Sequence, residues 1–475
     1  MNAIPTTVLD QLKDAVGPKG FIADPADMEP FLTEWRDLYR GVSPLILRPA
    51  STTEVSAILK ICNDTGTKVV PQGGNTSLCG GSVPFDGGDE IVLSLGRMNA
   101  VRTTDPLNDT ITVEAGCVLE QVHAAADDIG RHFPLRIGSQ GSCQIGGNLS
   151  TNAGGTAVLH YGNTRDLVLG LEVVLADGRV WDGLRGLRKD NTGYDLKQLF
   201  IGAEGTLGVI TAAVLKLFPK PSDVQTAFVA VPTVGAAVSL LEIARQQSGD
   251  QVTAFEIIPR IGIDIVTRHI PGTVDPIAEP HPWYLLIELS SGGTEGGLRA
   301  TLEAILAAGL ETGLVHDATL AESGAQSEMF WRIRDGMSEA QKPEGGSIKH
   351  DISVPISRIA EFIERADAAV DAIVPGFRSI AFGHIGDGNV HYNPMQPLGA
   401  DKQAFLAKWH AVSTAVHEVT AALGGSISAE HGLGRLKRDE ITRFKSPLEI
   451  ELMRGLKQSF DPKGILNPGK VVASA

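Results

Sequence analysis

Three glycine-rich segments in the N-terminal half constrain the fold of this chain more than any other feature. Residues 71–81 follow an expected strand and contain four glycines, residues 137–155 contain six, and residues 201–210 precede another expected strand. Glycine lets the backbone approach a ligand closely, and successive N–H groups with short polar side chains form concave anion sites. Together the segments predict a long ligand with a pyrophosphate near its middle.

Two common nucleotide motifs do not explain these segments. None of them matches GxGxxG after a strand, which disfavours an NAD-type Rossmann site. The C-terminal run 464–471 imitates a phosphate-binding loop, but Val471 occupies the Ser/Thr position and too little chain follows for the required helix.

The length of 475 residues predicts two or three domains. Strands and a helix over residues 45–71 indicate mixed α/β structure at the start. After Pro221 the pattern changes to strands and helices over 228–308 and again over 352–423, which favours a sheet with helices on one face. A helix over 449–460 and a turn-rich tail end the chain.

Charge and apolar patterning exclude several classes of partner. The 41 Lys and Arg against 56 Asp and Glu give a net charge of −15, which argues against nucleic acid or an anionic membrane as a partner. No apolar run approaches the ~18 residues of a membrane span, and the N-terminus lacks a signal-peptide pattern. Four cysteines without CxxC spacing fit a reducing compartment, so a cytoplasmic location is expected.

Residues 382–391 and 428–431 carry the strongest chemical signal. His384, His391 and Glu430 are the donor types of an open two-histidine, one-carboxylate metal site, and His431 remains as a neighbouring imidazole. Such a site leaves room for a substrate oxygen on the metal and a base beside it.

A structural interpretation competes for each of these residues. A histidine near a glycine turn is more often an ordinary surface or core residue, and Glu430 has the alternative of a helix cap or ion pair. The combination favours the metal site, because the turn-rich insert 385–390 allows the chain to fold back and bring both imidazoles together. His350 and His417 lack such context and are expected to be structural.

Several segments resemble the FAD domain of the vanillyl-alcohol oxidase and p-cresol methylhydroxylase (PCMH) superfamily. They are 71–81, 137–155, Asn191-Thr-Gly-Tyr-Asp-Leu196 and the run that begins at Gly202. Within it the chain looks like an FAD-linked D-2-hydroxyacid dehydrogenase. The resemblance implies an α+β fold: a two-subdomain PCMH-type FAD-binding domain (1–220), a substrate or cap domain with an antiparallel sheet covered by helices (221–425), and a small helical C-terminal segment (426–475).

The resemblance also implies FAD and the residues that hold it. Asn75 stands in the region where some members carry a flavin-linked histidine, so non-covalent FAD is expected, with a link through Cys79 or Cys143 as the less favoured alternative. The expected FAD-binding residues are Pro71, Gln72, Gly73, Gly74, Asn75, Thr76, Ser77, Gly138, Ser139, Gly141, Ser142, Gly146, Gly147, Asn148, Asn152, Gly155, Glu204, Gly208, Ile210 and Asn467.

The same resemblance assigns the catalytic positions. His384, His391 and Glu430 match the metal ligands, and His431 matches the base, which also contacts substrate. Asn393, Arg334, Ser338 and Lys349 match substrate-binding positions, the last three for a distal carboxylate. The family more usually has threonine where Ser338 stands, so affinity or size tolerance is expected to differ. Arg334 has a structural alternative, an ion pair with Asp335 on a solvated helix.

The implied reaction is oxidation of a D-2-hydroxy acid, foremost D-2-hydroxyglutarate to 2-oxoglutarate, by hydride transfer from C2 to flavin N5, with D-malate as a secondary substrate. Zn²⁺ suits the donors, with Mn²⁺, Fe²⁺ or Co²⁺ as alternatives. The expected partners are an electron-transfer flavoprotein or similar carrier and a second copy in a homodimer. The alternatives are a D-lactate or glycolate dehydrogenase of the same fold, a flavin-free metal hydrolase, and a non-catalytic flavin-binding protein.

Overall fold

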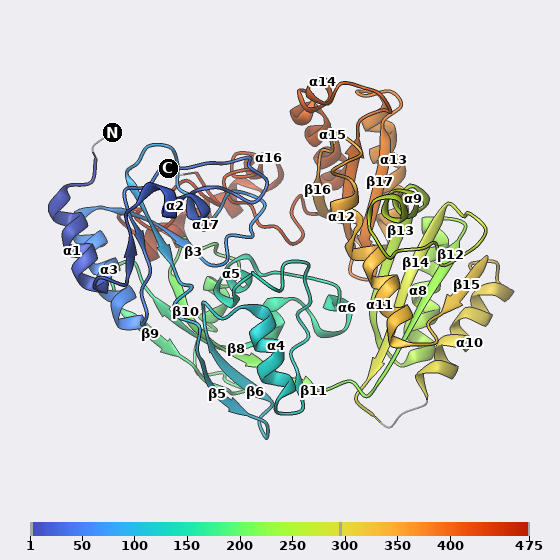
Figure 1. Cartoon of the computed structure of the whole chain (residues 1–475), viewed down its shortest axis with the longest axis horizontal. Coiled ribbons are helices and arrows are strands. Elements are labelled where there is room, and N and C mark those ends of the chain that lie inside the picture. The colour runs from blue at the N-terminus through green and yellow to red at the C-terminus, as the bar shows by residue number, and fades with distance from the viewer. Residues whose placement is uncertain (1–2, 294–296, 474–475) are drawn as a thin grey trace. The chain divides into compact units, whose positions relative to one another are not determined.

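The chain forms two compact units in a computed structural model that describes residues 3–293 and 297–473 (Figure 1). Unit 1 comprises residues up to Ala153, Asn163–Pro219 and the chain from His431 onward; unit 2 comprises Gly154–Gly162 and Lys220–Glu430. The chain therefore passes between the units several times, the last time at the Glu430–His431 bond. The functional division into 1–220, 221–425 and 426–475 stays a prediction.

Unit 1 begins with helices that cover a small sheet. Helix α1 (Thr6–Val16) packs beside α3 (Thr52–Thr65), whose start is capped by the Ser51 hydroxyl and whose end is closed by Gly66 in the left-handed conformation. The sheet contains, in spatial order, β1 (Phe21–Ile22), β2 (Ile46–Leu47), β4 (Glu90–Ser94) and β3 (Lys68–Gln72). Strands β2 and β3 run parallel to β4, which confirms the mixed α/β start.

Unit 1 also contains a second sheet, which is fully antiparallel, and a separate short pair of strands. It contains β5 (Val101–Asp105), β6 (Thr110–Glu114), β10 (Val209–Lys216), β8 (Val168–Val174) and β9 (Val180–Gly183). The short pair is β7 (Arg131–His132) and β11 (Phe218–Pro219). Besides α1 and α3, the described residues of unit 1 form the α-helices α2 (Pro25–Leu32), α4 (Leu119–Asp127), α5 (Ile145–Thr151), α7 (Lys197–Phe200), α16 (Ile441–Phe444) and α17 (Pro447–Phe460).

Unit 2 is built on a seven-stranded sheet in which every neighbouring pair is antiparallel. Its spatial order is β15 (Asp317–Leu320), β12 (Asp223–Val231), β14 (Trp283–Ser291), β13 (Val252–Pro259), β17 (Arg378–His384), β18 (Asn389–Met395) and β16 (His350–Ser353). The short helices α6 (Val158–Tyr161) and α14 (Lys402–Leu406) belong to the same unit.

Helices cover both faces of this sheet, so the expectation of helices on one face is wrong. One core contains residues of α8 (Val234–Ser248), α10 (Leu298–Glu311), α13 (Ile359–Asp371) and α15 (Trp409–Ala422). A separate core contains residues of α9 (Arg260–His269), α11 (Gly324–Asp335) and α12 (Met337–Ala340). The reason lies in the central strands: all of β13 is buried, and a strand that is apolar on both sides needs cover on both.

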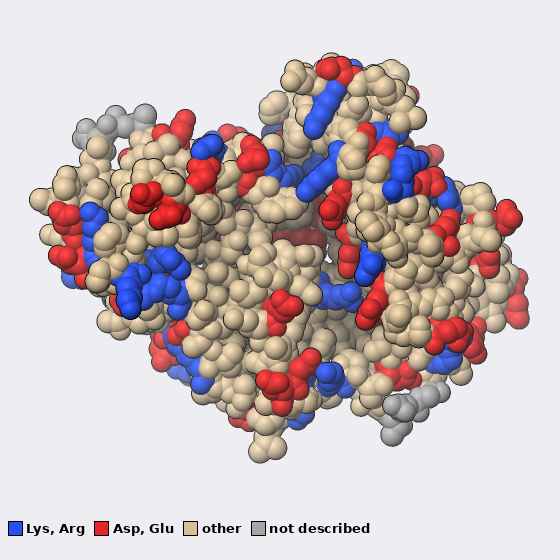
Figure 2. Space-filling view, in the orientation of Figure 1, with Lys and Arg blue, Asp and Glu red and all other residues tan. Residues whose placement is uncertain are grey.

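On the face drawn in Figure 2, Lys and Arg side chains are interspersed among Asp and Glu and form no broad basic surface. Among the described residues, no helix has the length and hydropathy needed to cross a bilayer.

Candidate active site

A hairpin in unit 2 brings the two expected histidine ligands together. His384 ends β17, and the antiparallel register places His391 of β18 opposite Phe382. Gly383 and Gly388 have φ values of +142° and +91°, conformations that favour glycine in the tight reversal. The two imidazole rings lie with their centroids 5.5 Å apart. The turn-rich insert therefore folds back as the sequence predicts.

Glu430 completes a donor set of the right geometry for a metal. The Nε2 atoms of His384 and His391 each lie 3.8 Å from a different carboxylate oxygen of Glu430. Two ligand atoms ~2.1 Å from one tetrahedral ion stand about 3.4 Å apart, so a small contraction fits all three donors to one ion. The residues present thus suit a divalent metal.

Two buried carboxylates that we did not predict support these histidines. Glu256, on β13, accepts a hydrogen bond of 2.6 Å from His384 Nδ1 and is 0% exposed. Asp351, on β16, accepts the Glu430 backbone N–H at 2.8 Å and lies 3.7 Å from His391 Nδ1. Carboxylates behind ligating histidines fix the ring orientation and tautomer.

The groups of this site perturb one another's protonation. Burial alone would lower the pKa of His384, but the carboxylates of Glu256 and Glu430 raise it to about 9. Burial raises the pKa of Glu430 to about 7 against the opposing effect of His384. Burial also disfavours ionised Glu256, yet Arg334 and His384 lower its pKa to about 2.

A second grouping overlaps the expected ligand set. One nitrogen or oxygen each from Asp351, His391 and Glu430 lie within 4.8 Å of one another, and His431 is the next residue in the chain. Both oxygens of Asp351 already accept amide donors, Oδ1 from Asn389 and Oδ2 from Glu430. Asp351 therefore fits a supporting role better than a ligand role. His431 is held near Glu430 by the peptide bond that joins them.

The expected substrate residues Arg334, Ser338, Lys349 and Asn393 belong to unit 2, as do the three donors. Arg334, on α11, donates from Nε to Glu256 at 2.6 Å, and its Nη2 is 3.3 Å from His384 Nε2. The alternative pairing with Asp335 on a solvated helix is therefore wrong, because Arg334 is only 7% exposed and its ion pair is with Glu256. Lys349 Nζ lies 3.5 Å from the backbone oxygen of Ser338.

Asn393 is buried on β18 and donates from Nδ2 to Gln341 at 3.2 Å. His350, expected to be structural, is buried and bonds with both ring nitrogens, to the Tyr392 backbone oxygen and the Ser413 hydroxyl. That pattern is typical of a core histidine and confirms the expectation.

The first glycine-rich segment of unit 1 has the geometry of an anion cradle. Among the described residues, the backbone N–H groups of 73–78 donate no hydrogen bond. Gly74 cannot carry a side chain, because a Cβ would lie 2.1 Å from the Ser142 backbone oxygen of the second segment. A Cβ on Gly138 or Gly147 would meet nothing within 4 Å. Orphan donors beside glycines with open space fit the pyrophosphate of FAD.

Several expected FAD residues use their side chains within the protein. Gln72 donates to the Phe31 and Ser82 backbone oxygens, and Asn75 donates to those of Pro30 and Thr33. Asn152 ends α5 in the left-handed conformation and accepts the Arg165 N–H. These side chains shape the loops, which leaves the backbone to face a ligand.

The remaining expected FAD residues occupy different places in the fold. Pro71 lies on β3, Gly146 and Asn148 lie on α5, and Ile210 is buried on β10. Gly155, with Gly154, belongs to the short segment of unit 2, whereas residues 137–153 of the same glycine-rich segment belong to unit 1.

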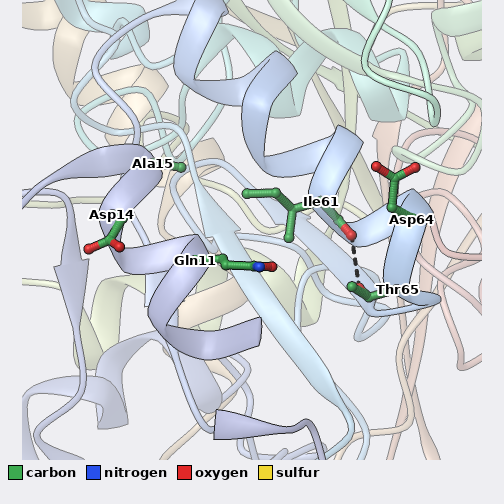
Figure 3. A pocket seen from close by; sticks show the side chains of 6 residues that line it. All are labelled: Gln11, Asp14, Ala15, Ile61, Asp64 and Thr65. Carbon is green, nitrogen blue, oxygen red and sulfur yellow. Dashed lines mark hydrogen bonds between the residues drawn. The ribbon is translucent and has the colours of Figure 1, made fainter. Parts of the chain in front are cut away.

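A surface cavity of about 720 Å³ lies between α1 and α3 (Figure 3). Its lining is Gln11, Asp14, Ala15, Ile61, Asp64 and Thr65. The Thr65 hydroxyl donates to the Ile61 backbone oxygen, and the lining includes none of the expected site residues. We therefore assign it no part in the chemistry.

Comparison with known proteins matches both halves of the chain to flavoprotein families. Residues 43–183 match the FAD binding domain family, and residues 220–471 match the family of FAD linked oxidases, C-terminal domain. A solved structure of p-cresol methylhydroxylase with substrate bound is similar over 99% of this chain and 97% of its own, with a TM-score of 0.77 and 16% identity. That structure confirms the PCMH-type α+β fold.

Two curated relatives are similar over most of their length. The mitochondrial D-2-hydroxyglutarate dehydrogenase of Arabidopsis thaliana is 42% identical over 460 residues, 97% of this chain and 80% of the relative. The D-2-hydroxyglutarate–pyruvate transhydrogenase of Saccharomyces cerevisiae is 39% identical over 456 residues, 94% of this chain and 90% of the relative.

The expectation of a cytoplasmic location is wrong on this comparison. It rested on the absence of a signal-peptide pattern and on the few cysteines, whereas the D-2-hydroxyglutarate dehydrogenases that match 97% of the chain are named as mitochondrial proteins. A reducing compartment and a lack of disulfides do not distinguish the two locations.

Proposed function

Because the chain belongs to the FAD-linked oxidase family and is an FAD-dependent D-2-hydroxyacid dehydrogenase, we propose that its substrate is D-2-hydroxyglutarate and its product 2-oxoglutarate. The observation that carries the proposal is the position of the cationic side chains. Arg334 lies beside the donor atom of His384, and Lys349 lies beside Ser338, four residues further along from Arg334. Two cationic side chains, one beside a proposed metal ligand and the other beside Ser338, suit a substrate with two carboxylates.

In this proposal His384, His391 and Glu430 hold a divalent metal, for which Zn²⁺ is the best match to the donors. A metal held there supplies Lewis-acid polarisation of the substrate hydroxyl oxygen. Glu256 accepts the His384 Nδ1 proton, which leaves the Nε2 lone pair, here 3.3 Å from Arg334 Nη2, as the one that a metal would take. His431 takes the hydroxyl proton of the substrate. Asn393 contributes a polar contact to substrate.

FAD rests without a covalent bond on the residues named from the glycine-rich segments, and when bound it supplies the acceptor for the C2 hydride. The N–H groups of 73–78 and the open sides of Gly138 and Gly147 support this assignment. Arg334 guides one substrate carboxylate: its Nη1 atom makes no hydrogen bond to the described residues, while Nε and Nη2 do.

An electron-transfer flavoprotein or similar carrier is the proposed acceptor of the electrons, and a homodimer the proposed assembly. The name of the yeast relative suggests pyruvate as another acceptor. Oxidation of reduced enzyme by a flavoprotein carrier or by pyruvate, compared side by side, separates the two.

The test is the visible spectrum of the purified protein under anaerobic conditions. D-2-hydroxyglutarate should bleach the flavin absorbance faster than D-lactate or glycolate, and pretreatment with a chelator should slow the bleaching until Zn²⁺ is restored. Bleaching by D-lactate or glycolate alone would replace the proposed substrate with the alternative one. Bleaching that no chelator affects would remove the metal from the proposal.

A matched pair of variants tests the distal carboxylate site. Arg334→Ala is a poor choice because it leaves Glu256 buried without its cation. Lys349→Ala should raise the KM for D-2-hydroxyglutarate about 10-fold and leave the KM for D-lactate unchanged. Lys342→Ala, which removes an exposed lysine seven residues earlier in the chain, should change neither KM.

A further inference from the structure

The Glu204 carboxylate of unit 1 holds the segment that follows His431. Its Oε1 accepts the Leu433 backbone N–H at 2.7 Å, and its Oε2 accepts the Gly434 backbone N–H at 2.8 Å. Gly432 leaves no room for a side chain, since a Cβ there would lie 2.7 Å from Glu204 Oε1. Three consecutive residues after the proposed base are thus fitted to one carboxylate.

Glu204 is itself fixed to the expected FAD-binding part of unit 1. Its N–H donates to the Ser150 backbone oxygen of α5 at 2.8 Å, and its carbonyl oxygen accepts from Asn467 Nδ2 at 2.8 Å. Its φ of +49° is uncommon for a residue other than glycine. Strained backbone that neighbours hold in place is often found at functional sites.

The chain enters unit 1 at His431, directly after the proposed metal ligand Glu430. We propose that Glu204 is a positioning residue that fixes the His431 segment to the flavin-binding unit. This inference rests on the proposed role of His431 as the base. It adds to the expectation that Glu204 is an FAD-binding residue, because both of its carboxylate oxygens accept backbone N–H groups of the His431 segment.

The consequence for catalysis follows from the geometry of proton transfer. Proton abstraction needs the base within hydrogen-bond reach of the substrate hydroxyl, and a displacement of about 1 Å costs on the order of 100-fold in rate. Glu204→Gln keeps the size of the side chain but replaces one of two acceptors by a donor that faces an N–H group. Glu204→Asp keeps the charge and shortens the reach.

Two measurements on the FAD-loaded protein test the proposal. Hydrogen exchange of the peptide over 431–436 should become at least about 10-fold faster in Glu204→Gln, because the variant unpairs an N–H. Flavin reduction by D-2-hydroxyglutarate should slow about 10- to 100-fold at saturating substrate, with FAD affinity within twofold of the wild type. Glu204→Asp should show both effects.

The matched control is Glu114→Gln, which alters another carboxylate of unit 1 that accepts a backbone N–H, that of Ala100. It should leave exchange over 431–436 unchanged. Loss of FAD from Glu204→Gln would overturn the proposal in favour of a cofactor contact, and unchanged exchange over 431–436 would overturn it outright. His431→Asn separates the two ideas: wild-type flavin reduction in that variant refutes the proposed base, while the exchange result still decides whether Glu204 anchors the segment.

Discussion

Replacing Glu256 by glutamine should weaken both the fold of unit 2 and its hold on a metal. Glu256 bonds Arg334 Nε and His384 Nδ1, each at 2.6 Å, and all three side chains are at most 9% exposed. Removing one partner of a buried ion pair costs about 3–5 kcal/mol, because the other charge is left uncompensated. Glutamine keeps one acceptor, so we expect the lower end, about 3 kcal/mol.

For a unit of this size, a loss of about 3 kcal/mol corresponds to a fall in Tm of roughly 6–12 °C. Loss of a carboxylate behind a ligating histidine also lowers metal affinity about 10- to 100-fold. Thermal unfolding measures the first effect, and competition of the protein with a chelator for Zn²⁺ measures the second.

Glu288→Gln is the matched control on the neighbouring strand β14. Glu288 accepts from the neutral Trp331 indole N–H at 2.8 Å, so its loss should cost about 1 kcal/mol and leave zinc affinity unchanged. Equal destabilisation by the two variants would refute the argument from buried charge. Unchanged zinc affinity in Glu256→Gln would refute the link between Glu256 and the ligand role of His384.

Three further changes test other parts of the molecule. Gly147→Val should abolish FAD retention, measured by absorbance after gel filtration. The Tm of the apoprotein should change little, because a Cβ at this position has no protein atom within 4 Å, and a variant that still holds a full complement of flavin would contradict the proposed FAD contact. Glu344→Gln should cost about 1–3 kcal/mol at pH 7, because hydrogen bonds from His269, Arg378 and Arg268 hold the pKa of Glu344 at about 2. Because the pKa of Glu344 is lower in the folded than in the unfolded state, its carboxylate stabilises the fold above the unfolded pKa and loses this contribution as pH falls. The difference in unfolding free energy between wild type and variant, measured by denaturant unfolding, should therefore shrink from about pH 4.5 towards pH 2; a constant difference would refute this. His391→Ala should reduce the amount of zinc bound, measured by elemental analysis, without releasing FAD, since the proposed metal ligands belong to unit 2 and the expected FAD residues other than Gly155 belong to unit 1; loss of both would argue against separate sites.

The sequence predicts those parts of the site that local pattern controls. The hairpin at 384–391 follows from a glycine-rich turn between two strands, and the first cradle follows from glycines after β3. Residue identity also marks the donors, because imidazole and carboxylate groups gather in two short runs. These features need no knowledge of which strands are neighbours.

Glu256 shows where sequence reasoning stops. It is the lone charged residue in the apolar strand β13, and a buried charge must have a partner, so a signal was present. Its partner His384 is 128 positions away, and only the pairing of β13 with β17 brings them together. The second helical layer does not follow from the sequence for a related reason: a strand that is apolar on both sides needs cover on both, but the alternation of strands and helices does not say which helices lie on which face.

The residues around the Glu430–His431 bond explain why one short segment carries so much of the proposed chemistry. Within unit 2, Asp351 accepts the Glu430 N–H, so the metal donor is fixed to the sheet that carries His384 and His391. Within unit 1, Glu204 accepts the Leu433 and Gly434 N–H groups, so the chain after the proposed base is fixed near α5. Asp351 of unit 2 thus holds Glu430, and Glu204 of unit 1 holds the residues that follow His431. A change at either carboxylate should therefore impair one role, metal binding or proton transfer, and spare the other.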